Sequence, residues 1–168
     1  MEWYRARTGC RRNTNSEIDT SKSRSQNGAI VLWLSLMPFR SEFDSLNKIL
    51  MFRFDGRLTD AVMQEYYRVA APGVIASIQF RASIVDFTDV NSFEVTPDLL
   101  RTLAWSKPID TEAGRPRIVV APSEIAYGLA RLFASHGEET RPSLRIVRNL
   151  GQAFVALGVT NCEFTPLP

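Results

Sequence analysis

Carboxylate and hydroxyl side chains able to bind a partner gather in residues 86–96 of the sequence. Asp86 lies near the end of the apolar run Ala82–Phe87, where a strand is expected. A half-buried carboxylate needs a partner, or its pKa rises, and either case makes Asp86 a candidate binding residue. The alternative is a structural role, in which Asp86 caps backbone N–H groups of the turn Thr88–Asn91.

Three hydroxyls follow Asp86, namely Thr88, Ser92 and Thr96. Thr96 stands before Pro97 and Asp98, an order typical of a helix N-terminus. A phosphate on Thr96 would meet free N–H groups and the positive end of the helix dipole. As the N-cap, however, the Thr96 oxygen is already used, so a structural role is the alternative. Ser92 is the more exposed hydroxyl and offers a weaker version of the same site.

The acidic residues of this stretch do not predict a metal site. Asp86, Asp89 and Glu94 lack the glycine turn and the regular ligand spacing of a calcium loop. No metal or other cofactor is therefore expected.

A second candidate site lies on a later helix. Tyr127 and Arg131 are four residues apart, so the ring can support the guanidinium at the rim of a pocket. Gly128 between them costs about 1 kcal/mol relative to alanine in a helix. Close packing on the sheet would explain the glycine, and the close approach of a ligand or partner is the alternative.

Catalytic motifs cannot be assembled from this sequence. His136 is the single histidine, and it stands in the polar stretch Ser135–Thr140 without a G-x-S-x-G motif elsewhere. The chain also lacks G-x-G-x-x-G and G-K-[ST] phosphate loops. These observations favour a binding protein over an enzyme.

Charge and cysteine content limit the partners and the compartment. Residues 1–36 carry six basic and three acidic side chains, whereas residues 37–168 carry 14 basic and 15 acidic ones. A nearly neutral domain has no electrostatic footprint for nucleic acid. The two cysteines, Cys10 and Cys162, form no disulfide or zinc pattern, which suits the cytoplasm. The apolar run Ala29–Met37 is too short to span a membrane.

The chain divides into three parts by composition. Residues 1–36 are expected to be a disordered or non-native extension, because they are mostly polar and lack periodicity. Residues 37–160 are expected to form one domain, and residues 161–168 an irregular tail.

The domain is expected to alternate strands and helices after an initial hairpin. The hairpin pairs Phe39–Asp44 with Lys48–Phe54, and Asp55-Gly56 ends its second strand. The later strands are expected at Ala82–Phe87, Arg117–Ala121 and Leu144–Arg148, with Thr88–Ser92 as a polar loop. Helices are expected after Thr59, Thr96, Ser123 and Asn149. This order predicts an α/β fold with a mixed sheet of four or five strands, parallel in its second part.

Several short stretches, taken together in order, resemble the bacterial STAS-like family, also called SpoIIAA-like after the sporulation anti-sigma-factor antagonist. These stretches are Gly56–Thr59, Ile84–Asp86, Leu99–Ala104, Arg117–Pro122, Tyr127–Arg131 and Leu150–Gly158. The resemblance covers about Met37 to Gly158 and implies a sheet flanked by helices that works as a binding or regulatory module. Some members of this family are likened to the CRAL-TRIO lipid-transfer fold.

One departure from the family concerns its phosphorylation switch. Phospho-switched antagonists carry an Asp-Ser-Ser-Gly-like segment at the helix start, where this chain has Glu94-Val95-Thr96-Pro97. Val95 stands in the place of the phosphorylated serine, so the resemblance does not carry that switch over to this chain.

Two functional hypotheses follow. The first is a non-enzymatic STAS-like module that binds a regulatory protein through residues 88–96, with a homodimer as an alternative to a monomer. The second is a carrier or sensor of a small apolar or anionic, lipid-like ligand. That ligand would be held between the first helix, with Tyr66 and Tyr67, and the helix of Tyr127 and Arg131.

Overall fold

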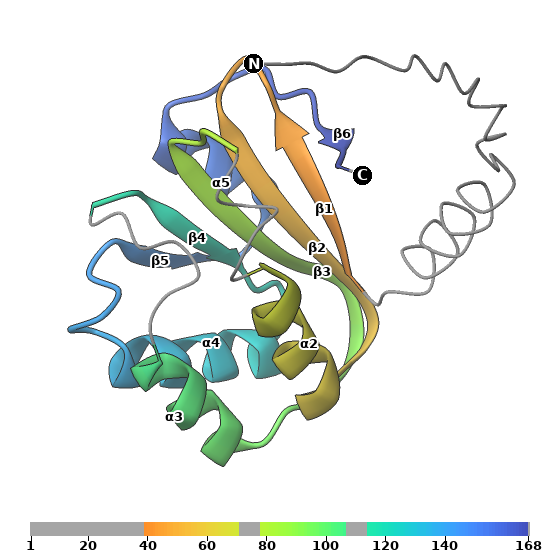
Figure 1. Cartoon of the computed structure of the whole chain (residues 1–168), viewed down its shortest axis with the longest axis vertical. Coiled ribbons are helices and arrows are strands. Elements are labelled where there is room, and N and C mark those ends of the chain that lie inside the picture. The colour runs from red at the N-terminus through yellow and green to blue at the C-terminus, as the bar shows by residue number, and fades with distance from the viewer. Residues whose placement is uncertain (1–38, 71–77, 107–113, 168) are drawn as a thin grey trace, which may run out of the picture. The chain divides into compact units, whose positions relative to one another are not determined.

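A computed structural model of the chain describes residues 39–70, 78–106 and 114–167 (Figure 1). The strands are β1 (Phe39–Asp44), β2 (Ile49–Thr59), β3 (Ala82–Glu94), β4 (Arg117–Val120), β5 (Leu144–Val147) and β6 (Thr165–Pro166). The helices are α2 (Asp60–Ala70), α3 (Pro97–Trp105), α4 (Glu124–His136) and α5 (Leu150–Leu157). The predicted extension 1–36 and the whole apolar run 29–37 lie outside the described residues.

The strands form one mixed sheet in the order β5-β4-β3-β2-β1-β6. β1 pairs antiparallel with β2, and β2, β3, β4 and β5 pair in parallel. The predicted α/β class, the initial hairpin and the parallel second half are therefore confirmed. The sheet has one strand more than the five predicted, because Thr165–Pro166 pairs with Glu42 and Phe43 at the edge of β1. The prediction that the whole tail is irregular is wrong at these two residues.

The stretch Thr88–Ser92, predicted as a loop, is part of β3. The prediction is wrong because β2 does not end at Asp55-Gly56 but continues to Thr59 and pairs with β3 as far as Glu94. Gly56 has a φ of 65° and lies between two register shifts, so it supplies the bulge through which β2 continues. Pairing with a neighbouring strand thus overrides the polar composition of residues 88–92.

Helices cover the two faces of the sheet unequally. In Figure 1, α2, α3 and α4 lie on one face and α5 on the other. The larger core belongs to the first face and includes Phe52, Phe54, Tyr66, Leu100 and Ala130. The smaller core belongs to the second face, where Ala153 and Leu157 of α5 pack on Ile84 and Ile118. We refer to these as the α2–α4 face and the α5 face.

Side-chain caps fix the starts of three helices at the predicted residues. Thr96 Oγ1 accepts a hydrogen bond from Leu99 N at 3.3 Å, and Asn149 Oδ1 accepts one from Gln152 N at 2.9 Å. Ser123 caps α4 in the same way, through Ala126 N at 3.1 Å. α4 runs to His136, so that histidine ends a helix rather than standing in a loop. No helix in the described part of the chain is both long and apolar enough to cross a membrane.

Candidate functional site

Asp86 is buried on the α5 face, with 1% of its surface exposed. Its Oδ1 accepts hydrogen bonds from Thr88 N at 3.0 Å and from Thr88 Oγ1 at 2.5 Å. Its Oδ2 has no hydrogen-bond partner in the described structure and lies 3.8 Å from Arg53 Nη1. Asp86 therefore holds the backbone two residues further along β3, in a strand where the structural alternative expected a turn. Its second oxygen lies beside an arginine.

The hydroxyls of Thr88, Ser92 and Thr96 are all engaged within the chain. Thr88 donates to Asp86, and Ser92 Oγ donates to Glu94 Oε1 at 3.0 Å. Thr96 is exposed, but its Oγ1 donates to Asp60 Oδ2 at 2.8 Å while it accepts from Leu99 N. Thr96 thus links the start of α3 to the start of α2.

Tyr127 contacts an arginine other than the predicted Arg131. The ring of Tyr127 lies 3.8 Å from the guanidinium carbon of Arg148, the residue that follows β5. Arg131 is exposed and makes no hydrogen bond or ion pair with the rest of the described chain. Gly128 is also exposed, and an added Cβ would meet nothing within 4 Å, so the expected close packing at this glycine is wrong.

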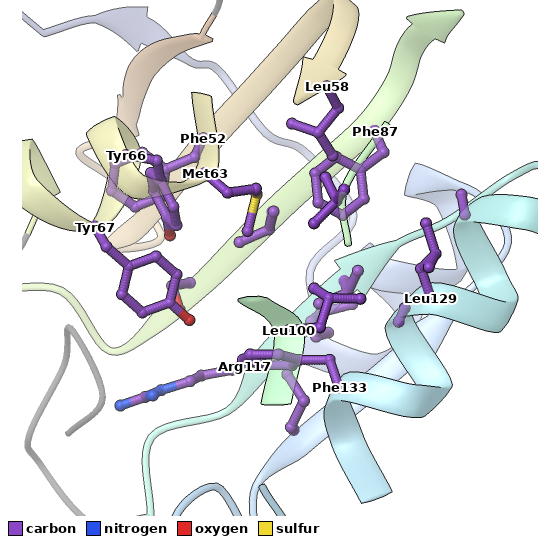
Figure 2. A pocket seen from close by; sticks show the side chains of 18 of the residues that line it. Phe52, Leu58, Met63, Tyr66, Tyr67, Phe87, Leu100, Arg117, Leu129 and Phe133 are labelled. Carbon is purple, nitrogen blue, oxygen red and sulfur yellow. The ribbon is translucent and has the colours of Figure 1, made fainter. Parts of the chain in front are cut away.

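A cavity of about 120 Å³ lies between the sheet and the helices α2, α3 and α4 (Figure 2). Apolar side chains from all of these elements line it, among them Phe52, Leu58, Met63, Phe87, Leu100, Leu129 and Phe133. None of the six residues predicted as binding residues, which are Asp86, Thr88, Ser92, Thr96, Tyr127 and Arg131, lies in its wall. The cavity does lie between the two helices that the second hypothesis named.

Polar groups gather toward one side of this cavity. Figure 2 shows Tyr66, Tyr67 and the guanidinium of Arg117 on the side away from Leu129. Ser83 and Arg141 complete the polar part of the wall. Tyr66 is buried among aromatic rings, with ring centroids 5.0 Å from Phe52 and 5.2 Å from Phe54. These contacts fix its ring and leave its hydroxyl at the cavity.

Burial keeps both tyrosines protonated. It raises the pKa of Tyr66 well above its usual range, although the charges of Arg117 and Arg141 act in the opposite direction. Burial also raises the pKa of Tyr67, and again Arg141 opposes it. Because these two arginines act on both phenols, the four side chains form one electrostatic cluster. The phenols remain neutral hydrogen-bond donors at any physiological pH.

Arg141 is the buried cation of the cluster, with 6% of its surface exposed. Its Nη1 donates to Ala104 O and Thr140 Oγ1, and its Nη2 donates to Leu103 O at 2.9 Å and Ser106 O at 3.1 Å. The guanidinium carbon also lies 4.9 Å from the ring centroid of Phe133. Arg141 thereby binds the last carbonyls of α3, where a cation also complements the helix dipole.

Sequence reasoning placed Tyr66 and Tyr67 in a pocket wall but missed Arg117, Arg141 and Ser83. Arg117 opens an apolar strand, and its side chain shares a face with Ser83 only because β3 and β4 pair in that register. Arg141 stands in a polar stretch of the sequence, and its partners on α3 are 35 to 38 residues away. No local signal could have identified it.

Comparison with protein-family models and with curated proteins gives no match to this chain. Within the described residues, no group of three His, Cys, Asp or Glu side chains is arranged to hold a metal ion.

Proposed function

We propose that this domain is a non-enzymatic binding protein that holds a small, mainly apolar ligand in the cavity between the sheet and α2–α4. The observation that carries the proposal is the cavity itself, which has an aromatic and aliphatic wall with Tyr66, Tyr67 and the guanidinium of Arg117 on one side. Ligand sites in proteins typically have this composition, because apolar contacts supply affinity and a few polar groups fix the orientation.

The size of the cavity limits the ligand. An engineered cavity of roughly 150 Å³ with an aliphatic and aromatic lining binds benzene, and the cavity here measures about 120 Å³. The part of the ligand that is enclosed would therefore be about as large as one aromatic ring or a short hydrocarbon chain.

Binding is proposed rather than catalysis because the described cavity wall offers no nucleophile with a base beside it. Ser83 is its one aliphatic hydroxyl, and the wall contains no histidine, cysteine or carboxylate. Nucleophilic catalysis needs an activating base within hydrogen-bond reach.

Filling the cavity tests this proposal. Ala130 of α4 is buried in the wall, so Ala130→Leu places three further carbon atoms in the cavity. Ala61→Leu makes the same change on the exposed face of α2 and is the matched control. Saturation-transfer NMR with toluene and benzoate should show at least one probe bound to the wild type and to Ala61→Leu. Affinity should fall about tenfold or more in Ala130→Leu.

The proposal would be wrong if neither probe bound the wild-type protein, or if Ala130→Leu bound the probes as well as the control does. A thermal melt of each variant separates loss of binding from loss of folding. Because Ala130→Leu fills a cavity, its folded state should persist.

A second candidate function is the STAS-like protein-binding module, which would use residues 88–96 in the bacterial cytoplasm. Its support is the edge of β3, since in the described structure β3 pairs with β4 no further than Asp86–Val120. An unpaired strand edge can accept an extended peptide. Hydrogen exchange separates the two functions. A protein partner should protect the backbone amides of residues 88–94, whereas a cavity ligand should protect those near Tyr66 and Tyr67.

A further inference from the structure

The polar side of the cavity carries positive charge without an acidic residue in its described wall. Building on the proposed function, we propose that the ligand is a small monocarboxylate. Its carboxylate lies against Arg141 and the hydroxyls of Tyr66 and Tyr67, and its apolar body fills the cavity. This assigns a head-group site to three residues from two distant parts of the chain.

Arg141 carries a buried charge without a counter-charge among the described residues. Charged groups that are buried in proteins are normally paired with an opposite charge. In the described structure Arg141 binds carbonyl and hydroxyl oxygens, and no carboxylate lies within ion-pair distance of it. Those bonds use Nη1 and Nη2, and the guanidinium also lies beside the Tyr67 hydroxyl. A carboxylate at the cavity would supply the missing negative charge.

Tyr66 and Tyr67 bring two phenol groups to the same side of the cavity. Tyr66 is 7% exposed, and its hydroxyl makes no hydrogen bond with another described residue. The Tyr67 hydroxyl lies beside the Arg141 guanidinium, which can only donate to it, so the O–H of Tyr67 also has no described acceptor. Both stay protonated because burial raises their pKa values. They are therefore donors without acceptors, and a carboxylate oxygen is an acceptor that can take more than one such bond.

The charged side chains in the described cavity wall are all positive. No aspartate or glutamate contributes to the described cavity wall, whereas Arg117 and Arg141 both do. Arg117 has other interactions in the chain, so the proposal uses only the sign of its charge. An anionic head group is favoured here over a neutral or cationic one.

The same geometry favours a single negative charge over a phosphate. Arg141 is seated on the C-terminal carbonyls of α3, the negative end of that helix dipole. Those carbonyls would repel a doubly charged head group more strongly than a singly charged one. Together with the cavity volume, this points to a carboxylate on one aromatic ring or a short chain.

The test compares benzoate with toluene, which share an aromatic ring and differ in the charged group. Both are titrated into the full-length protein by ligand-observed NMR. Benzoate should bind about tenfold or more tightly than toluene, because it adds charge-assisted hydrogen bonds. Arg141 also supports α3, so the variant used is Tyr67→Phe, which removes one hydroxyl. Tyr67→Phe should lower the affinity for benzoate about fivefold and leave the affinity for toluene unchanged.

Tyr127→Phe is the matched control, because its ring lies against Arg148 outside the cavity wall, and it should bind both probes as the wild type does. If toluene bound as tightly as benzoate, the head-group site would be wrong while the apolar cavity would stand. An equal loss of affinity for both probes in Tyr67→Phe would also contradict the proposed head-group site. If neither probe bound the wild type, the proposed function would itself have failed.

Discussion

Charged side chains on the two faces of the sheet contact different kinds of partner. On the α5 face, Glu42 accepts from Arg40 Nε and from Arg53 Nε, each at 3.0 Å, and Arg53 lies beside Asp86. Each described charge in this group has an opposite charge next to it. On the α2–α4 face, Arg141 is as deeply buried but meets carbonyl and hydroxyl oxygens.

This difference separates charges that serve the fold from those that could serve a ligand. The described charges on the α5 face are satisfied within the chain, by ion pairs at Glu42, Arg53 and Asp86 and by hydrogen bonds at Asp44. Changing them should therefore alter the free energy of unfolding and leave the affinity for the probes as it is. Changes in the cavity wall should alter the affinity for the probes and leave the free energy of unfolding nearly unchanged.

Asp44 should make the largest contribution to stability on the α5 face. It is 1% exposed, and it accepts hydrogen bonds from Leu46 N, Asn47 N and Asn47 Nδ2 between 2.7 and 3.0 Å, and from Glu163 N at 3.3 Å. Asp44→Ala leaves these donors without their acceptor and should lower the free energy of unfolding by about 2–4 kcal/mol. Urea denaturation measures the loss.

The affinity for benzoate and toluene should not change in folded Asp44→Ala. Asp44→Asn keeps one acceptor oxygen for the turn, so its free energy of unfolding should fall by only about 1 kcal/mol. An unchanged midpoint in Asp44→Ala would mean that the turn and the C-terminal segment do not depend on this carboxylate.

Lowering the pH should remove part of the stability that the Asp44 carboxylate gives the wild-type protein. Burial raises the pKa of Asp44, but the hydrogen bonds from Asn47, Glu163 and Leu46 outweigh it, so the net shift is below the usual 3.8. The folded state therefore binds this proton less readily than the unfolded state does. Its contribution to stability is complete above about pH 3.8 and is lost as the pH falls through the lower folded-state pKa.

Urea midpoints between pH 6 and pH 2.5 should show this loss in the wild type, and a smaller one in Asp44→Asn. If the urea midpoint fell equally with pH in the wild type and in Asp44→Asn, the lowered pKa of Asp44 would be contradicted.

Asp86→Asn should have a smaller effect than Asp44→Ala. The substitution keeps Oδ1 as the acceptor for Thr88 and replaces Oδ2, which has no hydrogen bond but lies near Arg53. We expect a loss of about 1 kcal/mol in urea denaturation and unchanged probe binding. A tenfold change in benzoate affinity would show that the two faces are coupled, and the separation between them would then be wrong.

Local signals in the sequence were sufficient for most of the fold. Thr96, Ser123 and Asn149 cap the predicted helices, since N-capping depends on residues within one turn. Residues 88–92 were misjudged because their strand exists only through pairing with the continuation of β2 past Gly56. That pairing joins residues more than 30 positions apart.

The site was less predictable than the fold for the same reason. Tyr66 and Tyr67 follow the apolar face of α2, so a pocket beside them was open to inference. Arg141 acquires its role by reaching Leu103 and Ser106, and nothing within its own loop indicates that contact. Tyr127 and Arg131 have helical spacing, but the ring binds Arg148 instead.

Gly128 should give the smallest effect and the only gain in stability. The sequence suggested that close packing or a ligand requires this glycine, yet an added Cβ would meet nothing within 4 Å. Its φ also lies outside the positive region, so alanine fits the helix without strain. Gly128→Ala should therefore raise the free energy of unfolding by about 0.4–1 kcal/mol, chiefly by restricting the unfolded chain. Benzoate affinity should stay the same, because Gly128 is exposed and outside the cavity wall. A destabilised variant with weaker benzoate binding would instead place a ligand or partner against this side of α4.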